Sequence, residues 1–497
     1  MAPGASRALD GTATVVQYPE PDEPTDPSLT PGMPPIRHRS RHSRPALAAA
    51  LAAVTACAVA GGGQQPAPPT AALPRAPGTA VVTVTPEPGW FTEPSIAVDP
   101  RDPRHLVAAY QDNAHAAWSR DGGRTWTVVD AAPPDFRVSG DVSVAFDDAG
   151  RAYICYIAFD RLGTTDYWAS HSSRNGIFVR RSPDGGATWD ARDADVKAFR
   201  DTRPGIPWED KPYIVADAGA RSPHRGALYV GWTEFRLDSS VILFSRSTDG
   251  ATSWSVPIRI STHAGLPRDD NGNVEGFTAA VGPRGTVYAA WADGNSIAFT
   301  TSRDGGTSFA PSRSVIHTAP PYFKVAGVAR ANGFPEIGLD PRTGRLFLTW
   351  SDYRNGDVDV FAATSADRGR TWSPPVRVND DTLHDGDDQF FQWLAVDPAT
   401  GAANVLFYDR RGDPDDRATR VTLARSTDGG RAWANFAWTT TPFDGGNAFI
   451  GDYTGLAAMN GRVYGIWTEE TPLPADPAAR RRPHSVVRIG VADFTPR

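Results

Sequence analysis

The sequence predicts an all-β protein built from repeats of one small antiparallel sheet. Three observations support this: an eight-residue motif recurs six times, sets of short β-prone strands recur seven times, and turn-forming residues are abundant. The 497 residues include 47 Gly, 44 Pro and 15 Trp but only 3 Met, which is typical of many short strands joined by tight turns. A motif at a near-constant spacing indicates a repeat architecture rather than several unrelated domains.

The recurring motif reads S-x-D-x-G-x-T/S-W. Its copies begin 55 to 65 residues apart, at Ser119, Ser182, Ser247, Ser302, Ser365 and Ser426. We interpret it as a hairpin turn, because Asp can accept hydrogen bonds from the N–H groups of its own turn and Gly supplies positive φ. The motif aspartates are therefore expected to be structural rather than catalytic: Asp121, Asp184, Asp249, Asp304, Asp367 and Asp428.

This motif resembles the Asp-box, also called the bacterial neuraminidase repeat. The resemblance covers more than 300 residues and implies a β-propeller of the sialidase-like superfamily, in which each box joins the third and fourth strands of a blade. Sialidases bind the substrate carboxylate with three arginines, the first in an Arg-Ile-Pro motif, and use a Tyr nucleophile paired with Glu and an Asp acid/base. No Arg-Ile-Pro occurs here, and Asp-boxes also occur in propellers of other functions, so the resemblance leaves function open.

The strands around the motif recur seven times, once more than the motif itself. The seventh unit ends after its third strand, Val486–Val491, and lacks a fourth. A spare strand at residues 79–85 starts the folded part, and we expect it to complete the last blade and cover its edge. The prediction is one seven-bladed β-propeller over residues 79–497, with a six-bladed ring and a C-terminal appendage as the alternative.

The N-terminal region is interpreted as an export signal. Residues 37–44 are basic, residues 46–56 are apolar over a signal-peptide length, and Cys57 completes a lipobox-like Val54–Cys57. We expect lipidation at Cys57 and an extracytoplasmic position on a bacterial cell surface. Cleavage near Ala60 with secretion is the alternative.

This interpretation divides the chain into four parts: a non-native or disordered extension (1–32) before a start at Met33, a signal peptide (33–57), a Gly/Pro/Ala-rich tether (58–78) and the propeller (79–497). The membrane is reached only through the lipid, since no apolar run approaches the roughly 18 residues of a spanning helix. A net charge of -7 without a basic block in the body excludes nucleic acid as a partner. The second cysteine, Cys155, lies in an apolar strand and is expected to be an inert core thiol.

Alternating strand directions place the starts of the first strands and the loops after the second strands at one mouth of the central channel. Acidic residues recur there in every unit, with Arg in four units. Such a set can bind a polar ligand through Arg and do acid/base chemistry on a glycosidic bond through paired carboxylates. Ion pairs within a blade and Asx-turns are the structural alternative.

Two segments stand out at this mouth, Pro207–Pro212 and Phe449–Gly455. The candidate catalytic residues are Glu209, Asp210, Asp452 and Tyr453, with Tyr453 as the candidate nucleophile. The candidate substrate-binding residues are Trp208, Lys211, Arg236, Glu275, Arg354 and Arg410. No cofactor is expected; Ca²⁺ is a weaker alternative, with Asp385–Asp388 as its best local site.

Two functions remain open at this point. One is a monomeric, lipid-anchored, sialidase-like glycosidase. The other is a non-catalytic propeller that binds a glycan or a cell-surface protein through the same residues.

Overall fold

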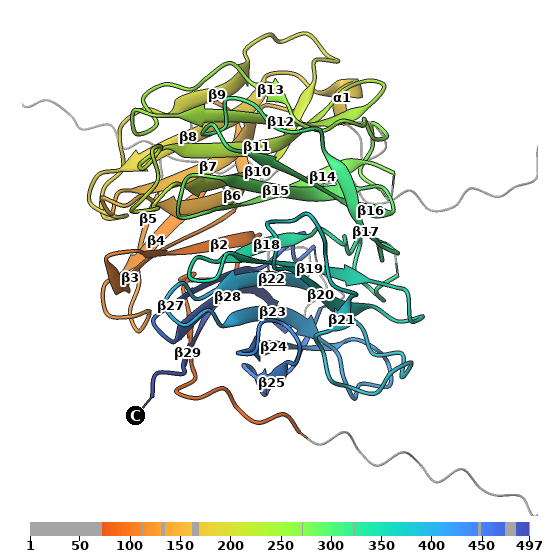
Figure 1. The fold of residues 1–497 in the computed structure, drawn as a ribbon. Coiled ribbons are helices and arrows are strands. Elements are labelled where there is room, and N and C mark those ends of the chain that lie inside the picture. The colour runs from red at the N-terminus through yellow and green to blue at the C-terminus, as the bar shows by residue number, and fades with distance from the viewer. Residues whose placement is uncertain are drawn as a thin grey trace, which may run out of the picture. The chain divides into compact units, whose positions relative to one another are not determined.

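The computed structural model describes residues 72–111, 113–130, 135–161, 168–270, 272–322, 324–445, 449–472 and 484–496. Seven antiparallel sheets follow one another along the chain and form the blades of a ring (Figure 1). The first strands of successive blades contact each other, and β27 contacts β2 to complete the circle. The seven-bladed β-propeller predicted from the sequence is therefore confirmed.

Each of the first three blades has four strands in chain order. Blade 1 contains β2 (Thr92–Asp99), β3 (Asp102–Gln111), β4 (His115–Ser119) and β5 (Thr127–Asp130). Blade 2 contains β6 (Val138–Phe146), β7 (Ala152–Phe159), β8 (Asn175–Ser182) and β9 (Ala194–Phe199), with the short helix α1 (Trp168–His171) between β7 and β8. Blade 3 contains β10 (Trp208–Ala216), β11 (Leu228–Phe235), β12 (Ser240–Ser247) and β13 (Ile258–Arg259).

The next blades repeat this order. Blade 4 contains β14 (Val274–Val281), β15 (Val287–Asp293), β16 (Ser296–Ser302) and β17 (Arg313–His317). Blade 5 contains β18 (Glu336–Asp340), β19 (Arg345–Asp352), β20 (Asp359–Ser365) and β21 (Val376–Arg377). Blade 6 contains β22 (Gln389–Val396), β23 (Ala403–Asp409), β24 (Ala418–Ser426) and β25 (Ala434–Ala437), and β26 (Phe443–Asp444) also pairs with β24.

The last blade combines the two ends of the described chain. It contains β27 (Gly455–Met459), β28 (Arg462–Glu470), β29 (Ser485–Asp493) and, as its outer strand, β1 (Ala80–Thr83). β1 pairs antiparallel with β29, with Ala80 opposite Val491 and Thr83 opposite Arg488. The predicted closing strand is therefore present, and backbone hydrogen bonds join the beginning and the end of the ring.

The repeated motif forms the turn between the third and fourth strands of a blade. In the first copy, Asp121 Oδ1 accepts from the N–H of Thr125 (3.0 Å), Asp121 Oδ2 accepts from the hydroxyl of Thr125 (2.7 Å), and Ser119 Oγ accepts from the N–H of Gly123 (3.0 Å). Partial burial opposes ionisation, but hydrogen bonds, first among them that from the Thr125 hydroxyl, outweigh it and lower the pKa of Asp121 to about 2. The carboxylate thus organises its own turn.

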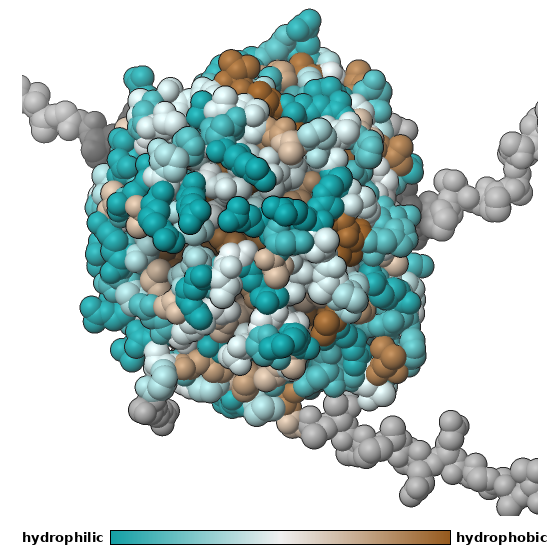
Figure 2. Space-filling model, in the orientation of Figure 1, coloured by the Kyte–Doolittle hydropathy of each residue, from teal (hydrophilic) through white to brown (hydrophobic). Residues whose placement is uncertain are grey.

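The core lies between neighbouring blades. Fully buried Trp side chains at or near the ends of second strands fill it, namely those of Trp232, Trp291, Trp350 and Trp467. Cys155 is fully buried in β7, and burial raises the pKa of its thiol. On the face in view the surface is mostly hydrophilic, with small separate apolar patches (Figure 2). Over the described ranges no helix has the length and apolar character needed to cross a membrane.

Candidate functional site

Five first strands share a one-residue β-bulge near their beginning. In β2, for example, Ser95 lies three residues after Thr92, whereas their partners on β3, Gln111 and Ala109, lie only two residues apart. The same shift occurs in β6, β10, β14 and β22. The bulged residues have positive φ: Glu93 (51°), Asp141 (46°), Lys211 (49°), Gly276 (73°) and Phe391 (50°).

Left-handed backbone is uncommon outside Gly and costs about 1–3 kcal/mol at a non-Gly residue. Three successive blades nevertheless place a charged residue there: Glu93, Asp141 and Lys211. Bulges redirect side chains and are frequent beside functional sites. The strained positions therefore indicate that a candidate site lies at the beginning of the first strands.

Charged and phenolic side chains from several blades interact around these bulges. We call this set the central cluster; it comprises Glu93, Asp141, Asp210, Lys211, Asp269, Glu275, Tyr322, Arg330, Asp452 and Tyr453. The structure thus brings together Asp210, Lys211, Glu275, Asp452 and Tyr453, which the sequence identified at separate positions.

Three carboxyl groups from consecutive blades form a hydrogen-bonded row. Asp141 hydrogen-bonds to both Glu93 and Asp210. A bond between two carboxyl groups requires a proton, since two carboxylates only accept. Burial, followed by the nearby charge of Asp141, raises the pKa of Glu93 and of Asp210 well above the ordinary range. A proton is therefore shared along this row of carboxyl groups.

A second row joins two blade-to-blade connections to blade 7. The hydroxyl of Tyr322 donates to Asp269 Oδ1 (2.6 Å), and Arg330 Nη1 lies 3.0 Å from Asp269 Oδ2. Arg330 also makes a two-pronged contact with Asp452, in which Nε donates to Oδ1 at 2.8 Å and Nη2 donates to Oδ2. Asn332 donates to the backbone oxygen of Asp452 (3.0 Å). Arg330 thus already has two carboxylate partners.

Lys211 lies among aromatic rings, and its charge also acts on the carboxyl group of Glu336. Its Nζ is 3.6 Å from the centre of the Tyr453 ring and 5.6 Å from that of Trp393. The Tyr453 hydroxyl donates to the backbone oxygen of Val142 over 3.4 Å. Burial, and then the charge of Asp141, raises the pKa of Tyr453 well above its ordinary value. Tyr453 therefore lies in the cluster, but its hydroxyl donates to the backbone oxygen of Val142 and not to a basic carboxylate.

The cluster meets solvent at its second row. The side chain of Arg330 is 23% exposed and that of Asp452 is 11% exposed, whereas Glu93 is 2% exposed. Phe449, an exposed aromatic residue, lies with its ring 5.4 Å from the Arg330 guanidinium. A ligand would accordingly reach the carboxyl groups past Arg330 and Phe449.

Other predicted site residues lie apart from this cluster. Strand alternation turns Glu209 away from Asp210, and Glu209 hydrogen-bonds to Trp232 and to Glu234, its partner across the sheet. Trp208 packs on Phe159 and on Trp168, with ring centres 5.0 and 6.0 Å away. These two residues belong to the interior of blades 2 and 3.

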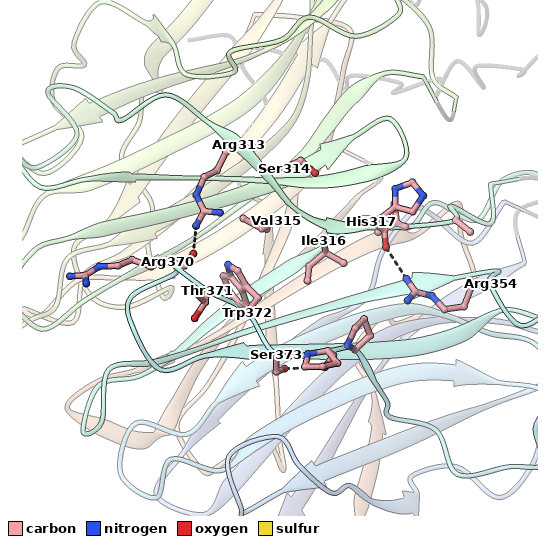
Figure 3. Close-up of a pocket in the computed structure, with 14 residues that line it drawn as sticks. Arg313, Ser314, Val315, Ile316, His317, Arg354, Arg370, Thr371, Trp372 and Ser373 are labelled. Carbon is pink, nitrogen blue, oxygen red and sulfur yellow. Dashed lines mark hydrogen bonds between the residues drawn. The ribbon is translucent and has the colours of Figure 1, made fainter.

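Each of the three remaining arginines bonds to groups outside the central cluster. Arg236 Nε lies 2.7 Å from Glu234 Oε1. Arg410 is fully buried, with Nε donating to Thr419 Oγ1 (3.1 Å) and Nη1 donating to Asp416 Oδ2 (3.2 Å). Arg354 pairs with Asp352 and lines a groove between blades 4 and 5 (Figure 3).

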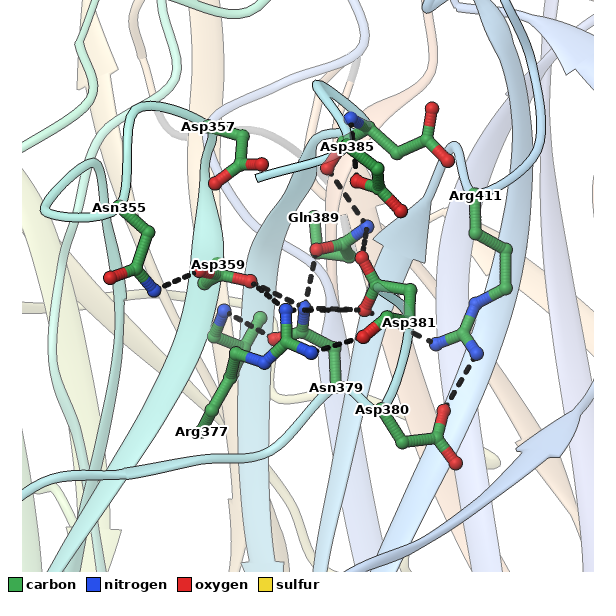
Figure 4. Close-up of polar contacts among 12 residues, drawn as sticks. Asn355, Asp357, Asp359, Arg377, Asn379, Asp380, Asp381, Asp385, Gln389 and Arg411 are labelled. Atoms are coloured by element: carbon green, nitrogen blue, oxygen red, sulfur yellow. Dashed lines mark hydrogen bonds and ion pairs between the residues drawn. The ribbon is translucent and has the colours of Figure 1, made fainter. Parts of the chain in front are cut away.

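The predicted Ca²⁺ segment belongs to a polar network between blades 5 and 6 (Figure 4). Its aspartates serve as loop acceptors: Asp385 Oδ1 accepts from the N–H of Asp387 (3.1 Å), and Asp388 Oδ1 accepts from the N–H of Val358 (2.8 Å). Within the described ranges no group of three or more His, Cys, Asp or Glu side chains is arranged to hold a metal ion. These carboxylates are used to fix loops.

Sequence reasoning missed Asp269, Tyr322 and Arg330. They lie in the connections that precede β14 and β18, where no strand register or motif fixes a residue's place. The only available signal was the length of these connections, because loops over a rigid scaffold often carry function.

Scans of protein-family models and of the curated proteins gave no match for this chain. Solved structures with similar folds include the endosialidase of phage phi92, which is 12% identical and covers 84% of this chain and 70% of its own, with a TM-score of 0.47. A Hadza microbial sialidase is 16% identical over 78% and 73%, with a TM-score of 0.44. An alpha-L-arabinofuranosidase from Fusarium graminearum is 13% identical over 71% and 92%, also with a TM-score of 0.44.

The structural neighbours thus include sialidases and other glycan-acting propellers. At this level of similarity none of them assigns an activity or a residue role to this chain. The central cluster is therefore the feature of this chain that bears on its function.

Proposed function

We propose that the protein is a glycan-acting glycoside hydrolase and that the central cluster is its catalytic site. The observation that supports this most directly is the row Glu93–Asp141–Asp210, in which buried carboxyl groups retain protons beside another carboxyl group. Glycoside hydrolysis needs an acid that is protonated near neutral pH and a second carboxylate as base or nucleophile. The cluster contains both kinds of group.

Asp210 is assigned as the general acid. It is more exposed than Glu93, so its proton is nearer to an incoming ligand. It would give that proton to the glycosidic oxygen while the bond from this oxygen to the anomeric carbon breaks. Asp452, which Arg330 holds at the exposed end of the cluster, is assigned as the base that takes a proton from the attacking water.

The charge of the cluster also bears on the substrate. Sialic acid carries a carboxylate, which is best bound by an arginine with free N–H groups. Arg330 is already paired with Asp269 and Asp452, so a sialoside would have to displace one of them. We therefore propose a neutral or amine-bearing sugar as the substrate. This differs from the sialic acid substrate that the resemblance to sialidases implies.

A panel of chromogenic glycosides tests the proposal. The purified protein is assayed with neutral, amine-bearing and sialic acid glycosides at pH 5–8, beside Asp210→Asn. Turnover of a neutral or amine-bearing glycoside that is lost in the variant is the expected result. Preferred cleavage of the sialoside would show that the substrate class is wrong.

The same panel separates hydrolysis from binding. If no glycoside is cleaved while the protein remains folded and retains glycans on an array, the protein is a binding propeller and the catalytic assignment fails. Saturation transfer measurements on the retained glycan would then identify the bound sugar.

We also propose that the chain is exported and carries lipid on Cys57. The support is the sequence alone, because residues 1–71 lie outside the described residues. Metabolic labelling with a fatty-acid analogue should label the native protein and not Cys57→Ala. Recovery of an unlabelled protein from the medium would favour the secreted alternative.

A further inference from the structure

A groove of about 770 Å³ lies between the outer strands of blades 4 and 5 (Figure 3). One wall is the continuous segment 313–319, which includes β17, the outermost strand of blade 4. The other wall is the segment 370–375, which ends in Pro374 and Pro375 just before β21.

The groove is basic although the protein is acidic. Its lining includes Arg313, Arg354 and Arg370 and contains no Asp or Glu, whereas the whole chain has a net charge of -7. Hydroxyl groups of Ser314, Thr318, Thr371 and Ser373 also line it. Local charge of this sign favours an anionic ligand.

The cationic groups lie at the two ends of the groove. In Figure 3 Arg313 and Arg370 lie toward one end and Arg354 toward the other, with Ile316 and Trp372 between them. The end with Arg313 and Arg370 is therefore suited to a negative group, and the middle to an apolar or sugar-ring surface. Trp372 is partly exposed, so part of its surface is accessible from the groove.

Two of the arginines are fixed by the fold and one is available. Arg313 Nη2 donates to the backbone oxygens of Gly369 and Arg370, the latter at 3.1 Å. Arg354 is paired with Asp352, its Nη2 donates to the backbone oxygen of His317 (3.0 Å), and its guanidinium lies 4.7 Å from the centre of the Phe361 ring. The exposed side chain of Arg370 makes no hydrogen bond or ion pair with any residue in the described ranges.

From these observations we propose that the groove is a second carbohydrate-binding site, separate from the central cluster, which binds a linear anionic saccharide. Arg370 and the free N–H groups of Arg313 bind its anionic group, whereas Arg354, already paired with Asp352, lines the other end of the groove. The sugar between them lies along Ile316 and Trp372, within reach of the groove hydroxyls. A cavity of this size matches a ligand of two to three sugar rings.

The anionic group can be a carboxylate or a sulfate, since Arg recognises both through the same paired N–H donors. A nucleic acid is the competing anionic polymer, since Arg also binds phosphate. Isothermal titration of the full chain at low salt uses polygalacturonate, dextran sulfate, neutral dextran and a single-stranded oligonucleotide. The first two probes distinguish the carboxylate from the sulfate.

The decisive variant is Arg370→Glu, with Arg124→Glu as its matched control. Arg124 occupies the same position of the repeated motif in blade 1, so both variants change the net charge equally and alter an equivalent turn. We expect Arg370→Glu to weaken binding of an anionic saccharide at least about tenfold, the effect of losing one charge-assisted contact, and Arg124→Glu to leave it unchanged.

Three results would overturn the proposal. Equal weakening by both variants would show attraction to overall charge, and no weakening by either would show that the groove is not used. Equal or tighter binding of dextran or of the oligonucleotide would show that the ligand class is wrong. Cleavage of small glycosides by the central cluster does not require the groove, so failure here leaves the proposed activity intact.

Discussion

The central cluster contains buried carboxyl groups from several blades, whereas the blade 4–5 groove is basic, exposed and formed by two blades. The cluster collects carboxyl groups in the interior, where burial raises the pKa of Glu93, Asp210 and Glu275. The groove exposes arginines on the side of the ring, where water screens them and their charge does not change with pH. Interior acids therefore respond to protons and surface arginines respond to salt. One fold thus presents two chemistries that can be tested separately.

The largest effect is expected at the acid of the central cluster. Asp210→Asn removes the proposed general acid and should lower turnover of a cleaved glycoside by about 10²–10⁴-fold. The matched control is Glu209→Gln, because Glu209 is the neighbouring buried acid and faces Glu234 instead. Steady-state kinetics of both variants would contradict the assignment if Glu209→Gln lost as much activity as Asp210→Asn.

The two phenols of the cluster should differ in their contribution to stability. Tyr322→Phe removes a 2.6 Å hydrogen bond to Asp269, and bonds to charged groups contribute about 1.5–3 kcal/mol. Tyr453→Phe removes a 3.4 Å bond to a backbone oxygen and should cost less than about 1 kcal/mol. Urea denaturation of both variants measures the difference, and equal losses would show that Tyr322 is no stronger an anchor than Tyr453.

Stability of the interior should fall as pH rises. Burial, opposed by the charge of Lys211, raises the pKa of Glu336 from 4.5 to about 8. Between these values the unfolded chain releases this proton and the folded protein retains it, so the free energy of unfolding decreases by at most about 1.4 kcal/mol per pH unit for this group. The protonated Glu336 contributes its full stabilisation below about pH 4.5, and this stabilisation has been lost above about pH 8.

Glu336→Gln should flatten that part of the stability profile. Thermal unfolding at several pH values from 4.5 to 8 compares the variant with the wild type. A variant whose profile keeps the original slope would show that Glu336 does not retain its proton in the folded state. Arg370→Gln in the groove is the control and should leave the pH profile unchanged, because Arg does not titrate in this range.

The smallest effect is expected in the floor of the groove. Trp372→Phe should change the free energy of unfolding by about 1 kcal/mol or less, because Trp372 is partly exposed and Phe309 fills the same motif position in another repeat. The free energy of binding an anionic saccharide should change more than the free energy of unfolding does. A matched Trp433→Phe variant in blade 6 should leave binding unchanged, and weakening there would show that the groove ring has no special part.

Sequence alone determined the architecture because its signals are local and repeated. Turn residues at a near-constant spacing located the blades, and the missing seventh motif identified the closing strand, which pairs with β29 as expected. The recurrence of acids at one register also predicted that several polar side chains would lie near one another, and Asp210, Lys211, Glu275, Asp452 and Tyr453 do so.

Tertiary structure decided which side chains meet. A left-handed bulge at one register re-aims residues such as Asp141 and Lys211, and a pattern of alternating residues cannot reveal an inserted residue. Alternation separates Glu209 from Asp210 although they are adjacent, while Arg330 reaches Asp452 across 122 positions of the chain. The groove likewise combines segments of two neighbouring blades, 313–319 and 370–375. Distances between blades are set by the closed ring and not by any one segment, so the sequence alone could not show which side chains form the central cluster.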